Sequence, residues 1–354
     1  MDSVRPNFSN QSWTEAQACG NIFQNPTPFI FLILAYFAFF IMSIVGNMTV
    51  IGIIIRNNRN KFRTPVHYMI FNLALIHLFI SCFSSPLALA RDILGYWFAN
   101  MTLCTIYGSL TNAFAIIEML TMGLMTVERY RAVASHGKHV FTVPQVLIAI
   151  AIIWLLGLLT VVIPTIASNS VRATQTIVYC TYHFKPSYNI NDLIYTATIV
   201  IFFYMIPFII ILALYTSLGY KLRRYNAEAR QRLGEAAIRN NSKVAEILWI
   251  LTVSFFLCWL PIFICAILIA FSVRGIIDHF CSFRIFFIIA HVLGFSYAGV
   301  NPVVLITLSD VYKSAAWQCC RHKVLPAALK RNNTQQSLHS GGRTEELQSN
   351  ISEM

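Results

Sequence analysis

Seven long apolar stretches constrain the fold of this chain more than any other feature of its sequence. Each is long enough to cross the hydrocarbon core of a bilayer, which takes about 20 mostly apolar residues in a helix. A helix also satisfies its own backbone polar groups, as a segment in lipid must. The chain is therefore predicted to be an all-α membrane protein, a bundle of seven transmembrane helices. The predicted spans are residues 29–55, 65–90, 104–132, 144–167, 193–220, 245–273 and 283–308.

The composition agrees with one membrane domain. Of 354 residues, 57% are hydrophobic and only 11% are charged, whereas soluble domains are about 25% charged. The polar start has no basic leader followed by an apolar run, so no cleavable signal peptide is expected. The predicted parts are an extracellular N-terminus (1–28), the transmembrane domain (29–308), a short amphipathic juxtamembrane helix (309–320) and a disordered cytoplasmic tail (321–354).

The net charge of +12 is explained by where the basic residues lie. Of the 26 Lys and Arg residues, 20 fall in the tail or in loops on one side of the predicted bundle. Basic loops face the cytoplasm, so we expect a multi-pass plasma-membrane protein with an extracellular N-terminus and no nucleic-acid partner. The sequons at Asn7, Asn10 and Asn100 then face the secretory lumen and are candidate glycosylation sites.

Every predicted span carries a short motif or a marked residue. In chain order these are Gly46-Asn47, Asn72-Leu-Ala-Leu, Glu128-Arg129-Tyr130, Trp154 with Pro164, Pro207 with Tyr215, Cys258-Trp259-Leu-Pro261, and Asn301-Pro302. Taken together in this order, the motifs resemble those of the rhodopsin-like (class A) family of G-protein-coupled receptors over residues 29–320. The resemblance implies a receptor, not an enzyme, that binds an extracellular ligand and activates a heterotrimeric G protein. Serines in the tail make arrestin a further candidate partner.

The resemblance assigns activation to the inner half of the bundle. It implies that Arg129 is restrained at rest and packs against the G protein on activation. It also implies that Trp259 lies under the ligand and transmits its movement to the bend at Pro261, which swings out the inner end of the sixth helix. Glu128, as a neighbour on the same helix, is expected to hold Arg129 only loosely. The predicted activation residues are Glu128, Arg129, Tyr130, Tyr215, Trp259, Pro261, Asn301 and Pro302.

The polar core departs from the family pattern. Where most relatives have an aspartate that holds a sodium ion, this chain has His77, and Glu118 stands at a place on the third helix that faces the same region. With Asn47 these residues form the predicted polar core. We hypothesise that His77 and Glu118 are a coupled pair whose shared proton titrates near physiological pH. The alternative is a neutral imidazole bonded to a protonated carboxyl throughout this range.

The resemblance places the ligand between the outer halves of the helices. Thr111 stands where amine receptors have an aspartate, which argues against a monoamine, and Phe295 stands where retinal-binding relatives have their Schiff-base lysine, so no retinal or other cofactor is expected. Similarity around His291 to peptide receptors favours a neuropeptide, with a lipid or small apolar ligand as the alternative. The predicted ligand-binding residues are Thr111, Asn112, Ala115, Tyr182, Trp259, Ile262, Phe263, His291 and Phe295.

The cysteines sort by their predicted side of the membrane. The resemblance implies a disulfide between Cys104 and Cys180 on the oxidising outer side. Cys19 and Cys281 also lie outside, and either pair with each other or remain free. Cys319 and Cys320 follow the predicted juxtamembrane helix and are candidate palmitoylation sites. No spacing of Cys or His suggests a metal site.

Two other classes of protein compete with the receptor interpretation. An intramembrane His77 and Glu118 would suit the relay of a transporter or proton channel. Transporters, however, typically show internal repeats and interrupted helices, and neither is visible in the sequence. A membrane enzyme would need a cluster of catalytic side chains, and the histidines of this chain are not clustered.

Overall fold

A computed structural model of the protein describes residues 26–56, 64–94, 97–134, 141–167, 194, 197–229, 235–270 and 280–324. Over this part of the chain the regular structure is helical, and seven helical segments are long and apolar enough to cross a membrane. The prediction of an all-α protein with seven spans is thereby confirmed. The spans are Ile30–Arg56, Pro65–Leu94, Met101–Ala132, Val143–Ile163, Ala197–Lys221, Lys243–Leu268 and Ile285–Leu308.

Some spans consist of more than one helical element. The second is built from two α-helices joined by a π-helical turn, and the fifth also contains a π-helical turn. In chain order the elements are α3 (Pro26–Arg56), α4 (Pro65–Phe79), η2 (Ile80–Ser84), α5 (Ser85–Leu94), α6 (Met101–Ala134), α7 (Val143–Ala167), η3 (Ile201–Met205), α10 (Ile206–Ala229), α11 (Glu235–Ala270), α13 (Phe280–Leu308) and α14 (Asp310–Val324).

The chain divides into two compact units, one ending at Ser309 and one beginning at Asp310. The second unit begins with α14, the short eighth helix, which runs to Val324 and thus past residue 320, where the sequence placed its end. A buried tyrosine lies on this helix, and burial raises the pKa of Tyr312 above its usual range.

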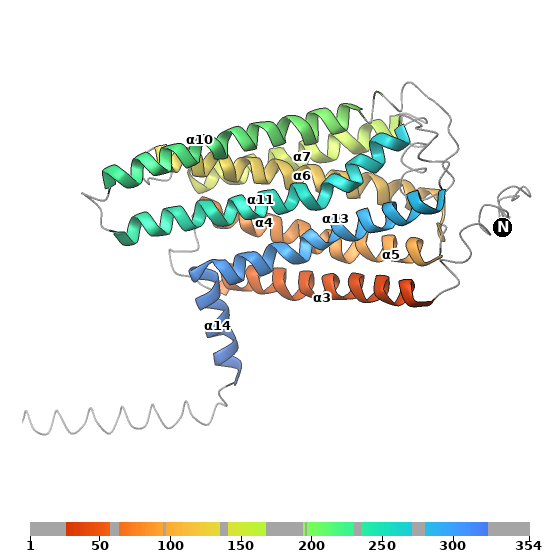
Figure 1. Ribbon diagram of the computed structural model, residues 1–354, viewed down its shortest axis with the longest axis horizontal. Helices are drawn as coiled ribbons and strands as arrows, with labels where there is room; N and C mark the ends of the chain where they lie inside the picture. The colour runs from red at the N-terminus through yellow and green to blue at the C-terminus, as the bar shows by residue number, and fades with distance from the viewer. Residues whose placement is uncertain are drawn as a thin grey trace, which may run out of the picture. The chain divides into compact units, whose positions relative to one another are not determined.

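The helices of the first unit run side by side with roughly similar axes (Figure 1). Helix α6 contacts α4, α7, α10 and α11, while α13 contacts α3, α4 and α11. The third and seventh spans are accordingly the most buried of the seven. Large apolar side chains such as Phe31, Ile148 and Phe202 are exposed on the outside of the bundle, where lipid would cover them. Polar side chains of α6 and α13 therefore have to find their partners inside the protein.

Two π-helical turns each end two residues before a proline. Turn η2 ends at Ser84 ahead of Pro86, and η3 ends at Met205 ahead of Pro207. Proline has no N–H to donate, and its ring clashes with the carbonyl four residues earlier, so the preceding turn opens. Each wide turn changes the face that the following residues present to the bundle.

Helices α3 and α13 approach closely at Gly46. A Cβ atom built on Gly46 would lie 2.6 Å from Cγ of Pro302, so only glycine fits here without a shift. The close contact brings the next residue, Asn47, within reach of α13, and its Nδ2 donates to the carbonyl oxygen of Ala298 at 3.0 Å. The first and seventh spans are thus joined at the level of the polar core.

Candidate functional site

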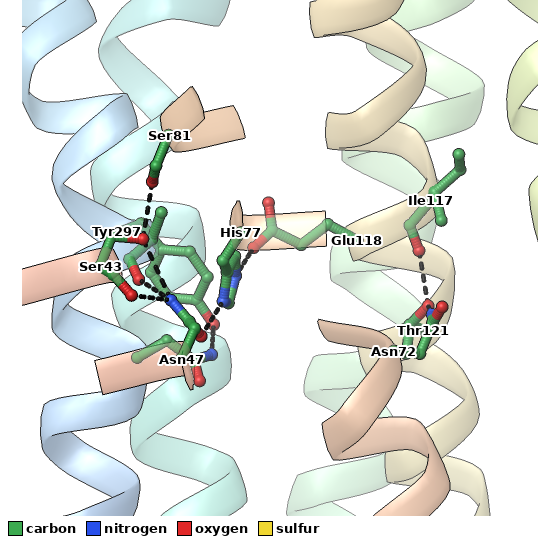
Figure 2. Close-up of polar contacts among 11 residues, drawn as sticks. Ser43, Asn47, Asn72, His77, Ser81, Ile117, Glu118, Thr121 and Tyr297 are labelled. Carbon is green, nitrogen blue, oxygen red and sulfur yellow. Dashed lines mark hydrogen bonds and ion pairs between the residues drawn. The ribbon is translucent and has the colours of Figure 1, made fainter. Parts of the chain in front are cut away.

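The structure brings His77 of α4 and Glu118 of α6 together in the middle of the bundle (Figure 2). Nε2 of His77 and Oε1 of Glu118 form a hydrogen bond, and both side chains are fully buried. Their positions lie 41 residues apart in the chain, so helix packing alone makes this pair. A buried ionisable pair inside a membrane span is expensive and is therefore a functional candidate.

Asn47 determines which atom of His77 carries a proton. Its Nδ2 donates to the carbonyl oxygens of Ser43 at 2.8 Å and of Ala298 at 3.0 Å, which orients the amide. Oδ1 of Asn47 then faces Nδ1 of His77 at 3.3 Å. An amide oxygen only accepts, so Nδ1 is the donor. The hydrogen bond between Nε2 of His77 and Oε1 of Glu118 consequently needs a second proton, which lies between these two atoms.

The polar core continues into two more helices. Ser81 Oγ donates to Ser43 Oγ at 2.6 Å, and the ring of Tyr297 meets the His77 ring edge to face, with centroids 5.5 Å apart. Asn301 donates from Nδ2 to the Tyr297 hydroxyl oxygen at 2.8 Å. Oε2 of Glu118 is buried and has no hydrogen-bond partner among the described residues. The core therefore joins the first, second, third and seventh spans and keeps one carboxylate oxygen unsatisfied.

A separate polar link ties three helices near the polar core. Asn72 donates from Nδ2 to Thr121 Oγ1 at 3.0 Å, and its Oδ1 accepts from Trp154 Nε1 at 2.8 Å. The Thr121 hydroxyl donates in turn to the carbonyl oxygen of Ile117 at 2.7 Å (Figure 2). The motif residues of the second and fourth spans thus have a clear structural role, which is to hold α4, α6 and α7 together.

The inner end of α6 carries the predicted activation residues. Nε of Arg129 donates to Oε2 of Glu128, so the acid holds its neighbour more directly than the helical spacing suggested. The long arginine side chain can curl back to reach the adjacent carboxylate, which the spacing of Cβ atoms alone does not show. Nη2 of Arg129 is buried without a hydrogen-bond partner among the described residues. It is therefore available to a new partner.

A basic residue of α10 also reaches this end of α6. Nζ of Lys221 lies 4.2 Å from the centroid of the Tyr130 ring, a cation–π contact. Sequence reasoning missed this contact because no motif marks Lys221. Nearby, the Tyr215 hydroxyl of α10 meets Thr252 Oγ1 of α11 at 3.4 Å. These two contacts connect α10 to both α6 and α11 at the inner half of the bundle.

The predicted ligand-binding residues lie on α6, α11 and α13, and most of them are buried. Thr111 donates to Ser84 Oγ at 2.9 Å, and the Phe263 ring packs on Tyr204 with centroids 4.0 Å apart. Trp259 is 3% exposed, and its Nε1 has no hydrogen-bond partner among the described residues. Tyr182 lies outside the described residues. Ala115, Ile262, His291 and Phe295 are buried and Asn112 is partly buried.

Two charged residues at the outer end of the second span were missed by the sequence analysis. Arg91 and Asp92 are buried on α5 and form an ion pair with each other. No charged residue was expected from the sequence in the ligand region, and the buried Arg91–Asp92 pair corrects that expectation. Both residues follow the wide turn η2, which changes the face that α5 presents to α3 and α13.

Disulfide and modification sites are described only in part. Cys104 forms a disulfide, and its predicted partner Cys180 lies outside the described residues, as do Cys19, Asn7 and Asn10. Asn100 is exposed and caps α6, because its Oδ1 accepts from the backbone N–H of Leu103 at 2.8 Å. Of the remaining candidates, Cys281 lies in α13, and Cys319 and Cys320 lie in α14.

Comparisons with known proteins agree with this arrangement. The model of the seven-transmembrane receptors of the rhodopsin family matches residues 46–305. Neuropeptide FF receptor 2 of Rattus norvegicus is 27% identical, over 83% of this chain and 74% of the relative. Neuropeptide FF receptor 1 of Homo sapiens is 23% identical over 96% and 83%, and substance-K receptor of Mus musculus is 24% identical over 81% and 75%. The chain belongs to the rhodopsin family of seven-transmembrane receptors, and it is a receptor rather than an enzyme.

Proposed function

We propose that this receptor binds an extracellular peptide and activates a heterotrimeric G protein. The observation that carries the peptide assignment is the buried Arg91–Asp92 pair, which lies in the outer half beside His291. A peptide offers charged and hydrogen-bonding partners to such groups, whereas a small apolar ligand or a lipid without a charged head group does not. The similarity to neuropeptide FF and substance-K receptors supports the same ligand class, and membership of the family disfavours the transporter alternative.

Activation proceeds from the outer half to the inner half through α11. The ligand acts on the layer that contains Trp259, whose ring packs against Phe255 with centroids 6.0 Å apart. Pro261 lies inside α11 and removes one backbone hydrogen bond, which makes bending easier there. Outward movement of the inner part of α11 breaks the contact of Thr252 with Tyr215. The Arg129 side chain then leaves Glu128 and contacts the G protein.

The polar core sets the balance between resting and active states. The bonds among His77, Glu118 and Asn47 cross-link α3, α4, α6 and α13 in the described arrangement. We infer that this pair takes the place of the sodium site of relatives. Because the pair is internal to the protein, its effect does not depend on an external ion.

We also propose an orientation of the chain in the membrane and a set of covalent modifications. The basic loops put the N-terminus (1–28) outside and the tail (321–354) inside, where arrestin would bind it. Oδ1 of Asn100 caps the helix and leaves Nδ2 for a glycan, so capping and glycosylation at this residue are compatible. The other proposed modifications are glycans on Asn7 and Asn10, disulfides Cys104–Cys180 and Cys19–Cys281, and palmitoylation of Cys319 and Cys320.

The test is G-protein nucleotide exchange in membranes that contain the full chain, with a panel of peptides, lipids and small molecules. We expect exchange that a peptide stimulates and that Arg129→Ala abolishes. Arg131→Ala is the matched control, since Arg131 is an exposed arginine on the same helix and should leave exchange unchanged. Stimulation by a lipid alone would overturn the peptide assignment. Exchange that survives Arg129→Ala would overturn the coupling mechanism.

A further inference from the structure

The outer end of α5 holds an ion pair between two neighbouring residues. Nε and Nη2 of Arg91 donate to Oδ1 of Asp92 at 3.0 and 2.7 Å. The Tyr36 hydroxyl of α3 donates to Oδ2 of the same carboxylate at 2.9 Å. The exposed fractions of the Arg91 and Asp92 side chains are 1% and 0%. Both carboxylate oxygens of Asp92 are therefore satisfied by side chains of the protein itself.

Ring contacts extend from this pair into α13. Cζ of Arg91 lies 5.3 Å from the Phe287 ring centroid. His291 stacks obliquely on Phe287 at 4.3 Å and on Phe295 at 6.1 Å, and Phe295 lies 6.4 Å from Tyr36. Together with the ion pair and the Tyr36–Asp92 hydrogen bond, these contacts form a closed ring of side chains, which we name the outer ring. Its members are Tyr36, Arg91, Asp92, Phe287, His291 and Phe295.

Stability is a poor explanation for a charged pair in this place. Adjacent helical residues do not naturally face each other, and removing two charges from water offsets most of what their attraction contributes. Buried charges within membrane spans are rare and usually functional. A role in binding a partner therefore explains the charges of the outer ring better than a role in stability.

His291 indicates what kind of partner is missing. Its Nδ1 faces the carbonyl oxygen of Phe287 at 2.8 Å, and because that oxygen only accepts, Nδ1 carries the hydrogen. In the neutral ring, Nε2 is then a bare acceptor, and it is buried without a hydrogen-bond partner among the described residues. Arg91 and Asp92 lie close enough to act electrostatically on His291. The outer ring thus combines a carboxylate, an unsatisfied acceptor and an aromatic face, which together suit a cation that donates several hydrogen bonds.

We propose that the outer ring binds a cationic side chain of the ligand, and that Arg91 occupies this site until the ligand arrives. The incoming guanidinium or ammonium group takes the place of Arg91 on Oδ1 of Asp92 and over Phe287, and it also donates to Nε2 of His291. Arg91 lies in the last turn of α5, which ends at Leu94, so its long stem can carry the displaced guanidinium to the outer water. This inference rests on the proposed function insofar as the cation belongs to a peptide.

The site can be tested without knowledge of the ligand. The full chain is purified in lipid nanodiscs as the Arg91→Ala variant, and its thermal unfolding is followed with n-propylguanidinium, n-propylammonium or neutral n-propylurea. We expect n-propylguanidinium to raise the unfolding temperature by about 3 °C or more, and n-propylurea to have little effect. A response to n-propylammonium as well would assign the site to lysine or amine groups in addition to arginine. Equal shifts with n-propylurea would mean simple cavity filling and would overturn the proposal.

Three control proteins sharpen the test. The double variant Arg91→Ala/Asp92→Asn lacks the carboxylate and should not respond to n-propylguanidinium. Wild type should respond little, because Arg91 fills the site. Arg131→Ala removes an exposed arginine that also lies 5.3 Å from an aromatic ring, that of Phe141, but forms no ion pair with a carboxylate of the described residues, so it should not respond either. A shift of the same size in the double variant or in Arg131→Ala would overturn the proposal.

A second variant covers the case in which Arg91→Ala does not fold. Arg91→Gln keeps a hydrogen-bond donor near Asp92 and should also respond to n-propylguanidinium. Failure of both variants to fold, even with n-propylguanidinium present, would show that Arg91 is structural and would overturn the inference. The readout needs neither peptide nor G protein, so a response without any stimulated exchange would keep the site and remove the signalling proposal. If a peptide that lacks every cationic group stimulated exchange, and Asp92→Asn did not diminish this stimulation, the signalling proposal would stand and the cation site would be overturned.

Discussion

Nε2 of His77 and Oε1 of Glu118 form a hydrogen bond that joins α4 to α6 in the centre of the bundle. The two arginine–carboxylate ion pairs among the described residues, Arg91–Asp92 and Arg129–Glu128, each lie within one helix. The His77–Glu118 contact is therefore the contact between ionisable side chains that helix movement would stretch most directly. Its loss should affect stability and signalling together.

Replacing both members of this pair should destabilise the receptor by less than the sum of the two single replacements. His77→Leu or Glu118→Leu leaves one buried ionisable group without its partner, at a cost of about 3–5 kcal/mol. His77→Leu/Glu118→Leu removes both groups, so we expect a coupling energy of about 1–3 kcal/mol in the double-mutant cycle. Thermal unfolding of the four proteins in nanodiscs measures it. Additive effects of the two single variants would contradict the contact.

Gly46→Ala should destabilise the bundle by about 1–3 kcal/mol. The added Cβ would lie 2.6 Å from the rigid ring of Pro302, so α3 and α13 would have to separate and the bond from Asn47 to Ala298 would weaken. Gly52→Ala on the same helix is the matched control, since no described residue beyond the adjacent turns of the helix lies within 4 Å of its added Cβ. That control should be neutral or slightly stabilising, because alanine favours helix more than glycine does. Equal losses of thermal stability in both variants would argue against the close approach of the helices.

Removal of the cation–π contact between Lys221 and Tyr130 should raise basal exchange about 2–5-fold. Such contacts contribute about 0.5–1 kcal/mol at exposed sites, and this one holds the inner part of α10 on α6. Lys221→Ala and Tyr130→Leu both remove it, whereas Tyr130→Phe keeps the aromatic face and serves as the control. Basal exchange is measured without ligand at equal surface expression. If Tyr130→Phe behaved as Tyr130→Leu does, the hydroxyl rather than the ring would be responsible.

The spans and the motif positions follow from the sequence alone. In lipid, an apolar run of this length satisfies its own backbone hydrogen bonds only as a helix. Seven transmembrane helices were therefore predictable without any tertiary information. The positions of Trp154, Arg129 and Pro261 followed from their motifs in the same way. His77 and Glu118 were also expected to meet, because the resemblance to the receptor family places both positions around the same polar region.

Other parts of the molecule were decided only by packing. The turns η2 and η3 depend on how each helix resolves the missing hydrogen bond of its proline, and either a kink or a wide turn was compatible with the sequence. Because η2 changes the face of everything after it, no periodicity argument placed Arg91 and Asp92 in the interior. Their burial requires α3 to supply Tyr36 and α13 to supply Phe287 and His291, segments far apart in the chain. The sequence by itself determined which segments cross the membrane, and the tertiary structure decided which of their side chains meet.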